Sequence, residues 1–557
     1  MAVLYKTLNI EISDYKAAVE RWTTILERTH SWGTPQRVTI GARAASSTEI
    51  EHDMIKMGAS RLRALKARSD NPKFEAQVLI DFLRKLPSLS DLEWQSGTPL
   101  VPPLVQFLRD QLPSCNLHLK SLKMAYDTDP CYIRSVLYLP SLQTIWLERK
   151  HHDVIQDVVQ HILRAPDGNL RELRILWSHT GASPFGEPPI VWDQELVAYD
   201  GQRLGQLQSL QLAGIQGAEG TGLQTWARHT DFGQLRALSL EMPVTRVALE
   251  TLINLPLQSL HSLGLVLDPH DTSDQYSAAL QTFICNLPSL SHLRLTGALP
   301  SLALKAILDY LDSVLHTLYL TPAGKDSCRF VFDSSTIALV TDSCKHVQDL
   351  GIDIRRAWNK PGEDIAILKA IGRMPHLSSL DLTFNASDYA LLFDSNDVNE
   401  PKDLAPSDPS FSAFDTEPFL SGFGVAKNPR KGHIRDALIN SAIDAELAKA
   451  VFNTITSAAP DGETPSLQRL SLKAAGGGNF GTSTINGSIA EIVEEVGREW
   501  IVERSGYEDV LEVRRAEVDD EEIERSESLG WDVEPILRRV WPGDGVWFNE
   551  WQAFPLV

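Results

Sequence analysis

A short apolar phrase recurs along most of this 557-residue chain and limits how the chain can fold. Each copy has apolar residues at its first, fourth and sixth positions, with variable residues between them. Twelve copies start between residues 62 and 377, so eleven intervals span 315 residues and average about 29 residues each. The copies are LRALKA (Leu62), LSDLEW (Leu89), LKSLKM (Leu119), LQTIWL (Leu142), LRELRI (Leu170), LQSLQL (Leu207), LRALSL (Leu235), LHSLGL (Leu260), LSHLRL (Leu290), LHTLYL (Leu315), VQDLGI (Val347) and LSSLDL (Leu377), and one more, LQRLSL, starts at Leu467. This regularity indicates a repeat array.

Each repeat combines two periodicities. The end of the phrase alternates apolar and polar residues, which predicts a short strand with one buried face. Between phrases, apolar residues recur at helical spacing, for example from Phe74 to Leu86 and from Leu304 to Leu311. One strand and one helix cannot bury a core alone, so neighbouring repeats must stack into a curved solenoid. We expect the strands on its concave face and the helices on its convex face.

The phrase and its period resemble the leucine-rich repeat family over roughly residues 60–475. That family follows the phrase with two residues and an asparagine, and Asn385 occupies this place in LSSLDLTFN. Other copies lack the asparagine, and the intervals vary from 23 to 37 residues. The resemblance implies an α/β fold, an irregular leucine-rich-repeat solenoid with loops of unequal length.

Three regions depart from the repeat. Residues 1–60 predict an irregular first repeat or cap, with a strand near 4–12, a helix over 14–29 and a strand over 37–40. Residues 61–385 carry most of the repeats. Residues 386–429 are rich in Asp, Ser, Pro and Gly, which predicts a disordered acidic insertion. Residues 430–475 form the last repeat, with one helix expected over 434–458. Residues 476–557 are acidic and then rich in tryptophan, and are expected to cap the array.

The two ends carry a narrower resemblance. The opening LYKTLNIEI and the tail stretches REWIVERSGYEDV and VWPGDGVWFNEWQAFPLV are similar to those of fungal F-box proteins with leucine-rich repeats. In that family the F-box binds the adaptor subunit of a cullin ubiquitin ligase, and the repeats select a substrate. No Leu-Pro-x-Glu phrase precedes Leu4, so we do not expect this chain to bind the adaptor through an F-box. Truncation and a true F-box-less relative are both open.

Charge and cysteine content exclude several classes of function. Lys and Arg total 52 and Asp and Glu total 73, a net charge of −21, of which −12 lies between residues 489 and 534 and −4 between 386 and 436. A protein that binds duplex nucleic acid needs clustered cations, so nucleic acid is not an expected partner. No membrane span or secretory signal is expected. The five cysteines form no CxxC pair, which favours an intracellular location, cytoplasmic or nuclear.

No catalytic, cofactor or metal site is expected. Gly476, Gly478 and Gly481 satisfy G-x-G-x-x-G after a predicted strand, but no second strand with a terminal acid follows at the required distance. A flexible loop is the simpler interpretation, with a nucleotide-binding enzyme as the alternative. His151, His152 and His161 lack an HExxH pattern and a cysteine partner, which favours a solvated helix edge.

The concave strands supply the candidate binding residues. Side chains two, four and six positions after the start of each phrase point away from the core and are expected to face a partner. Trp, Tyr and Arg are frequent energetic anchors of protein interfaces, so Trp146 beside Arg174 is the first candidate, and Arg294 beside Tyr319 the second. The full set is Trp146, Glu148, Glu172, Arg174, His292, Arg294, Tyr319 and Asp381. Packing of Trp146 under a loop over 178–200 is the alternative.

These features predict a non-enzymatic protein–protein interaction solenoid without cofactors. The resemblance implies the substrate-recognition part of an F-box-type ubiquitin ligase receptor that lacks its F-box here. The alternatives are a leucine-rich-repeat scaffold unrelated to ubiquitination and a nucleotide-binding enzyme that uses the loop 476–481.

Overall fold

The computed structural model divides into two compact units, Met1–His261 (unit 1) and Ser262–Val557 (unit 2), and each is described by itself. Both are α/β structures of mostly parallel strands, and in the described part of the chain the strands do not close into a barrel. The structure describes residues 6–11, 15–41, 76–96, 99–123, 135–149, 169–177, 206–213, 223–224, 226–227, 230–268, 271, 273–288, 290–297, 301–311, 314–321, 332–356, 362–386, 411–419, 430–459, 466–478, 487–505, 510–516, 533–543 and 551–556.

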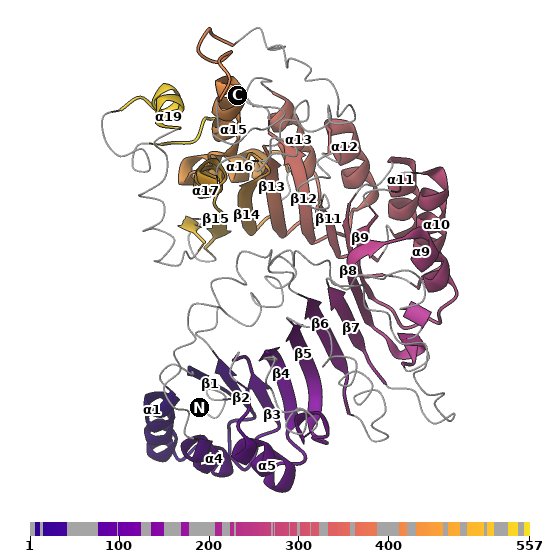
Figure 1. The fold of residues 1–557 in the computed structure, drawn as a ribbon, viewed down its shortest axis with the longest axis vertical. Helices are drawn as coiled ribbons and strands as arrows, with labels where there is room; N and C mark the ends of the chain where they lie inside the picture. The colour runs from indigo at the N-terminus through magenta and orange to yellow at the C-terminus, as the bar shows by residue number, and fades with distance from the viewer. Residues whose placement is uncertain are drawn as a thin grey trace. The chain divides into compact units, whose positions relative to one another are not determined.

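The strands of unit 1 lie side by side in sequence order, and every neighbouring pair is parallel (Figure 1). They are β1 (Thr7–Glu11), β2 (Arg37–Gly41), β3 (Asp91–Trp94), β4 (Asn116–Lys123), β5 (Leu142–Arg149), β6 (Glu172–Trp177), β7 (Ser209–Ala213) and β8 (Ala237–Val244). Parallel neighbours need crossover connections, which include the helices α1 (Tyr15–Thr29), α4 (Ala76–Arg84) and α5 (Pro102–Gln111) and the 3-10 helix η2 (Phe232–Gln234). Helix α9 (Arg246–Ile253) follows β8.

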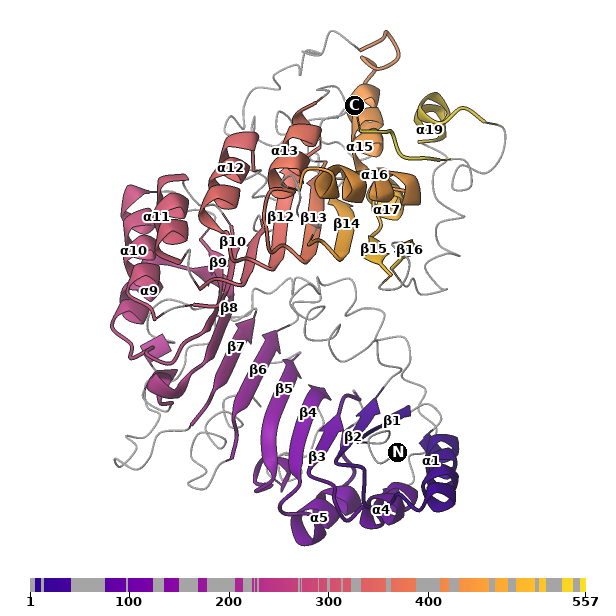
Figure 2. The same ribbon diagram turned by 180° about the vertical axis from the view of Figure 1, so that it is seen from behind.

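Unit 2 begins with six parallel strands and ends with two antiparallel ones (Figure 2). The parallel strands are β9 (Ser262–Leu267), β10 (His292–Thr296), β11 (Thr317–Thr321), β12 (Asp349–Arg355), β13 (Ser379–Asn385) and β14 (Arg469–Ala475), and the antiparallel strands are β15 (Trp500–Arg504) and β16 (Leu511–Arg515). The helices α10 (Asp274–Cys285), α11 (Ser301–Leu311), α12 (Ser334–Ser343), α13 (Glu363–Ile371) and α16 (Ala445–Thr456) pack in a row. Three further helices are α15 (Lys431–Ser441), α17 (Gly487–Val496) and α19 (Glu534–Val540).

The apolar residues of the phrase form the core of both units. In eleven copies, those that start at residues 89, 142, 170, 207, 235, 260, 290, 315, 347, 377 and 467, the three apolar side chains are at most 8% exposed. In β7, β8 and β9 the buried residues alternate with half-buried or exposed ones. Each strand therefore has one leucine face and one polar face, as period-2 geometry requires. The copy from Leu62 lies outside the described residues.

The predicted N-terminal elements are confirmed as β1, α1 and β2, and β1 pairs with β2 in parallel. The phrase assigned from Leu119, however, is out of phase with both neighbouring strands. Register pairs Leu117 with Leu92 of β3 and with Leu142 of β5, so the assigned copy starts five residues late relative to β3 and two residues late relative to β5. In NLHLKSLKM the alternation is interrupted by the consecutive polar residues Lys120 and Ser121, so the apolar residues on either side of them offer two phases in sequence, and the register with β5 shifts at this point.

The single helix expected over 434–458 is two helices, α15 and α16. The break lies at 442–444, where the carboxylate of Asp444 accepts a hydrogen bond from the Leu447 amide (2.8 Å) and caps the N-terminus of α16. Helix α16 packs against α13 and leads to β14. Helix α15 instead packs against α17, α19 and the strands β13 and β14.

Disorder was expected over 386–429, and this does not hold for residues 411–419, which form a turn that packs on α15. Phe419 is 5% exposed and belongs to the apolar cluster of α15, α17 and α19. The backbone amides of Lys431 and Gly432 donate to the carbonyls of Glu417 and Asp415 (both 3.0 Å), so the turn satisfies open donors at the N-terminus of α15. The prediction of disorder rested on the overall composition of the segment, which gave no weight to the few apolar residues that hold this turn.

Candidate protein-binding surface

The polar face of β3 to β6 places the first group of candidate residues in register. Asp91 pairs with Asn116, Thr144 pairs with Glu172, and Trp146 pairs with Arg174. Neighbouring strands lie only about 4.8 Å apart, so side chains at paired positions contact each other. We call the residues Asp91, Glu93, His118, Lys120, Thr144, Trp146, Glu172 and Arg174 the unit 1 polar row.

A chain of hydrogen bonds crosses four strands within this row. His118 contacts Asp91 Oδ1 through Nε2 (3.4 Å) and Thr144 Oγ1 through Nδ1 (3.0 Å). The Thr144 hydroxyl donates to Glu172 Oε2 (3.4 Å). Burial raises the pKa of Asp91, but hydrogen bonds from Ser90, Asn116 and His118 together lower it by a larger amount. The net shift of the pKa is therefore downward, and the carboxylate stays ionised.

Glu93 and Lys120 form an ion pair beside this chain of hydrogen bonds. The Lys120 Nζ and Glu93 Oε1 atoms are 3.0 Å apart, and the Glu93 side chain is 9% exposed. Burial raises the pKa of Glu93, but the hydrogen bond from Gln95 and the charge of Lys120 bring it below its ordinary value. The row therefore presents paired charges held in fixed geometry.

Trp146 is expected to be an outward anchor, and the structure buries it to 9% exposure. Its indole nitrogen donates to Glu172 Oε1 (2.9 Å). The Lys120 Nζ lies 5.2 Å and the Arg174 Cζ 5.3 Å from the centre of the ring. The two cations cover the ring because their long side chains reach across from neighbouring strands. Glu148 lies on β5, and its side chain is outside the described residues.

The second group of candidates lies on the polar face of β10 to β13. Arg294 pairs with Tyr319 in register, which confirms that the two are neighbours. The Tyr319 ring crosses β12 at Gly351, and its hydroxyl donates to Asp381 Oδ2 (2.9 Å) two strands away. Burial and the nearby Asp381 raise the pKa of Tyr319, so the hydroxyl stays protonated. Tyr319 is 7% exposed, whereas His292 at the start of β10 is exposed.

A third row lies nearer the carboxyl ends of the same strands. Asp353, Thr383 and Lys473 occupy paired positions on β12, β13 and β14. Asp353 is 7% exposed, and burial raises its pKa to about 7, although Lys473 and the hydrogen bond from Thr383 lower it. This carboxyl group is therefore partly neutral at physiological pH.

Five members of the unit 1 polar row lie outside the predicted binding set: Asp91, Glu93, His118, Lys120 and Thr144. His118 and Lys120 stand on β4, the strand whose phrase was placed too late in the sequence. The signal was present in the alternation of Asn116 to Leu119, which precedes the assigned copy. A search for the leucine at the expected interval alone cannot choose between the two phases.

The glycine motif lacks the surroundings of a dinucleotide site. Helix α17 follows Gly476 and Gly478, but the next strand, β15, pairs antiparallel to β14, whereas a dinucleotide-binding unit has parallel strands. A Cβ atom at Gly477 would lie 2.2 Å from Ser441 Oγ and 2.9 Å from Val493, so this glycine allows close packing. Gly481, His151, His152 and His161 lie outside the described residues.

Among the described residues, no three His, Cys, Asp or Glu side chains are placed to hold a metal ion. No helix among them combines the length and apolar character needed to cross a bilayer. Comparison with protein-family models and with curated proteins gave no significant match.

Proposed function

We propose that this chain is a non-enzymatic protein-interaction protein of the leucine-rich repeat type, which binds its partner on the polar faces of its parallel strands. The observation that carries the proposal is the unit 1 polar row. Its charged, aromatic and hydroxyl side chains are fixed to one another across four strands before any partner arrives. Side chains that are already ordered lose less conformational entropy on binding.

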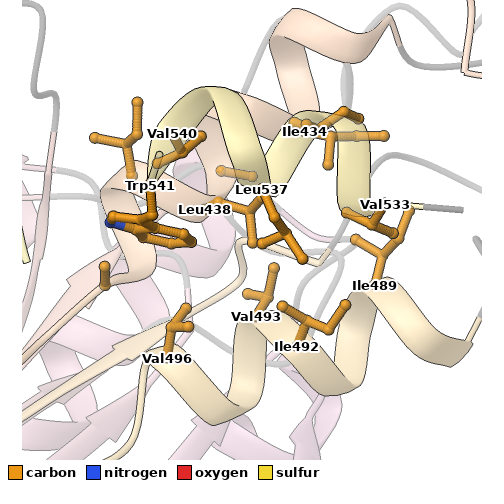
Figure 3. Close-up of a cluster of buried hydrophobic side chains, with 14 of the residues drawn as sticks. Ile434, Leu438, Ile489, Ile492, Val493, Val496, Val533, Leu537, Val540 and Trp541 are labelled. Atoms are coloured by element: carbon orange, nitrogen blue, oxygen red, sulfur yellow. The ribbon is translucent and has the colours of Figure 1, made fainter. Parts of the chain in front are cut away.

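The elements at the carboxyl ends of β13 and β14 fit the same proposal. Helices α15, α17 and α19 bury a shared apolar cluster there (Figure 3). A stacked array needs such a cap, because its last repeat otherwise exposes an apolar face.

The resemblance of the sequence to fungal F-box proteins supports a narrower proposal, that the chain selects substrates for a ubiquitin ligase. Affinity purification from a fungal extract with the chain as bait, followed by mass spectrometry, tests this. Recovery of the cullin adaptor at near-equal amounts supports the receptor role. Enrichment of another protein without the adaptor favours a scaffold unrelated to ubiquitination.

Paired variants test which face binds. Trp146→Ala removes the indole ring together with its hydrogen bond to Glu172, and Arg174→Ala removes one of the two cations. Both are expected to reduce partner capture at least tenfold, since aromatic and Arg anchors dominate interface energies. Gln106→Ala, an exposed residue on α5, is the matched control. Unchanged capture by folded Trp146 and Arg174 variants contradicts binding on this face.

A further inference from the structure

The C-terminal segment Trp551–Leu556 lies against unit 2 without regular secondary structure. Three consecutive residues of this segment are held through their backbone atoms, each by a side chain from a different element. These side chains belong to Arg356, which follows β12, to Asp444 at the start of α16, and to Trp541 at the end of α19.

Arg356 is the most buried of the three, at 3% exposure. Its guanidinium donates to the Phe554 carbonyl (2.8 Å) and to the Ala442 carbonyl at the end of α15 (2.6 Å), and it lies 5.4 Å from the centre of the Phe384 ring. Burial lowers the pKa of Arg356 to about 10, while Asp364 and Asp444 raise it, so the group stays charged at neutral pH. A buried cation of this kind needs acceptors, and the segment supplies one.

Asp444 and Trp541 complete the backbone contacts. The Ala553 amide donates to Asp444 Oδ2 (2.8 Å), while Oδ1 of the same carboxylate caps α16. The Trp541 indole donates to the Gln552 carbonyl (2.8 Å). Hydrogen bonds to backbone atoms do not depend on the sequence of the bound segment.

Two aromatic side chains supply what is specific to the segment. Trp551 and Phe554 pack against the cluster of α15, α17 and α19, and the ring centres of Trp551 and Trp541 are 6.2 Å apart. Gln552 and Pro555 are exposed. The segment thus combines backbone contacts for affinity with two aromatic anchors three positions apart for specificity, as in domains that bind peptides.

We infer that Arg356, Asp444 and Trp541 form a peptide-binding site, filled by the chain's own C-terminal segment, that accepts a partner segment with two aromatic residues three positions apart when its own segment leaves. The inference is independent of binding on the strand faces. A segment of the same chain competes at an effective concentration on the order of millimolar, which keeps the site closed until the segment is displaced.

The test uses the whole chain with the double substitution Trp551→Ala and Phe554→Ala, which removes both anchors of the resident segment. The probe is a fluorescent peptide with the sequence of residues 551–557, WQAFPLV, and binding is read by fluorescence anisotropy. The substituted chain is expected to bind the probe at least tenfold more tightly than the unsubstituted chain. A peptide with both aromatic residues changed to alanine is expected to lose binding, and adding Arg356→Lys to the chain is expected to weaken it about tenfold.

Absence of probe binding by the folded double variant overturns the inference. Circular dichroism establishes folding, and if the double variant unfolds, the single variant Phe554→Ala is measured with probe up to about 1 mM, the range of the competing segment. Failure at that concentration also overturns the inference. If the unsubstituted chain forms a concentration-dependent dimer in which each copy binds the C-terminal segment of the other, the inference is overturned in favour of self-association. Capture experiments on Trp146 and Arg174 are unaffected by either result.

Discussion

Adding one methyl group at Gly351 tests the contact between Tyr319 on β11 and Asp381 on β13. A Cβ atom there would lie 2.1 Å from Cδ1 and 2.5 Å from Cε1 of Tyr319, far inside van der Waals contact. The backbones of β11 and β12 are fixed by paired hydrogen bonds, so Gly351→Ala is expected to displace the ring. The displaced ring no longer brings the Tyr319 hydroxyl to Asp381.

The magnitude follows from two losses and one gain. A hydrogen bond to a charged group contributes about 1.5–3 kcal/mol. Overpacking a buried side chain costs about 1–3 kcal/mol, and this overlaps with the first loss because movement of the ring relieves the clash. Alanine restricts the unfolded chain more than glycine does and returns about 0.5–1 kcal/mol. We expect Gly351→Ala to lower the free energy of unfolding of unit 2 by about 2 kcal/mol.

A double-mutant cycle with Tyr319→Ala isolates the cause. Without the ring there is nothing for the new methyl group to displace, so Gly351→Ala is expected to be neutral or slightly stabilising in that background. Hydrogen exchange of β11 to β13 under native conditions measures unit 2 by itself. Gly33→Ala in unit 1, measured by hydrogen exchange of β1 and β2, is the control for adding a methyl group, because no atom lies within 4 Å of a Cβ there. An equal cost of Gly351→Ala with and without the tyrosine refutes the reasoning.

Three further predictions concern unit 2. Burial raises the pKa of Asp353 to about 7, so the folded chain is more stable at pH 4, where the carboxyl group is neutral, and loses this contribution as the pH rises to 7. Asp353→Asn is therefore expected to flatten the pH dependence of the unfolding free energy. An unchanged slope between pH 5 and 8 contradicts this. Asp415→Asn breaks the 2.7 Å ion pair with Arg435 and is expected to speed hydrogen exchange of residues 411–419 by about tenfold. Unchanged exchange would show that apolar packing alone holds the turn. Gly372→Ala places a Cβ 2.1 Å from the carbonyl oxygen of Ile455, so α13 and α16 must separate. The free energy of unfolding measured by urea denaturation is expected to fall by about 1–3 kcal/mol. A change near zero would show that the helices shift freely.

The positions of most strands could be predicted from sequence because leucine alternation encodes them directly. A strand with one buried face needs apolar residues at every second position. The phrase has only one stretch with this spacing, so it fixes where the strand lies. The pairing of Arg294 with Tyr319 followed from the same rule. The predicted phase was wrong at β4, where Lys120 and Ser121 interrupt the alternation and the register with β5 shifts.

The break between α15 and α16 and the state of Trp146 could not be predicted in the same way. Asp444 caps a helix only because residues 442–444 leave the helical conformation, and an apolar pattern continues across the break. The exposure of Trp146 depends on Lys120 and Arg174, which reach it from two other strands. Contacts between strands depend on register, and the register at β4 was the one that sequence left ambiguous.

The contacts within the unit 1 polar row determine how any binding experiment on it must be read. Trp146, Glu172 and Arg174 are each held by another member of the row, so removal of one changes the geometry of the rest. Loss of capture in an alanine variant therefore combines a missing contact with a disturbed surface. Trp146→Phe helps to separate the two, because a smaller aromatic ring remains between the cations while the indole nitrogen and its hydrogen bond to Glu172 are lost. If this variant binds normally and Trp146→Ala does not, the ring itself is the anchor and the hydrogen bond only orients it.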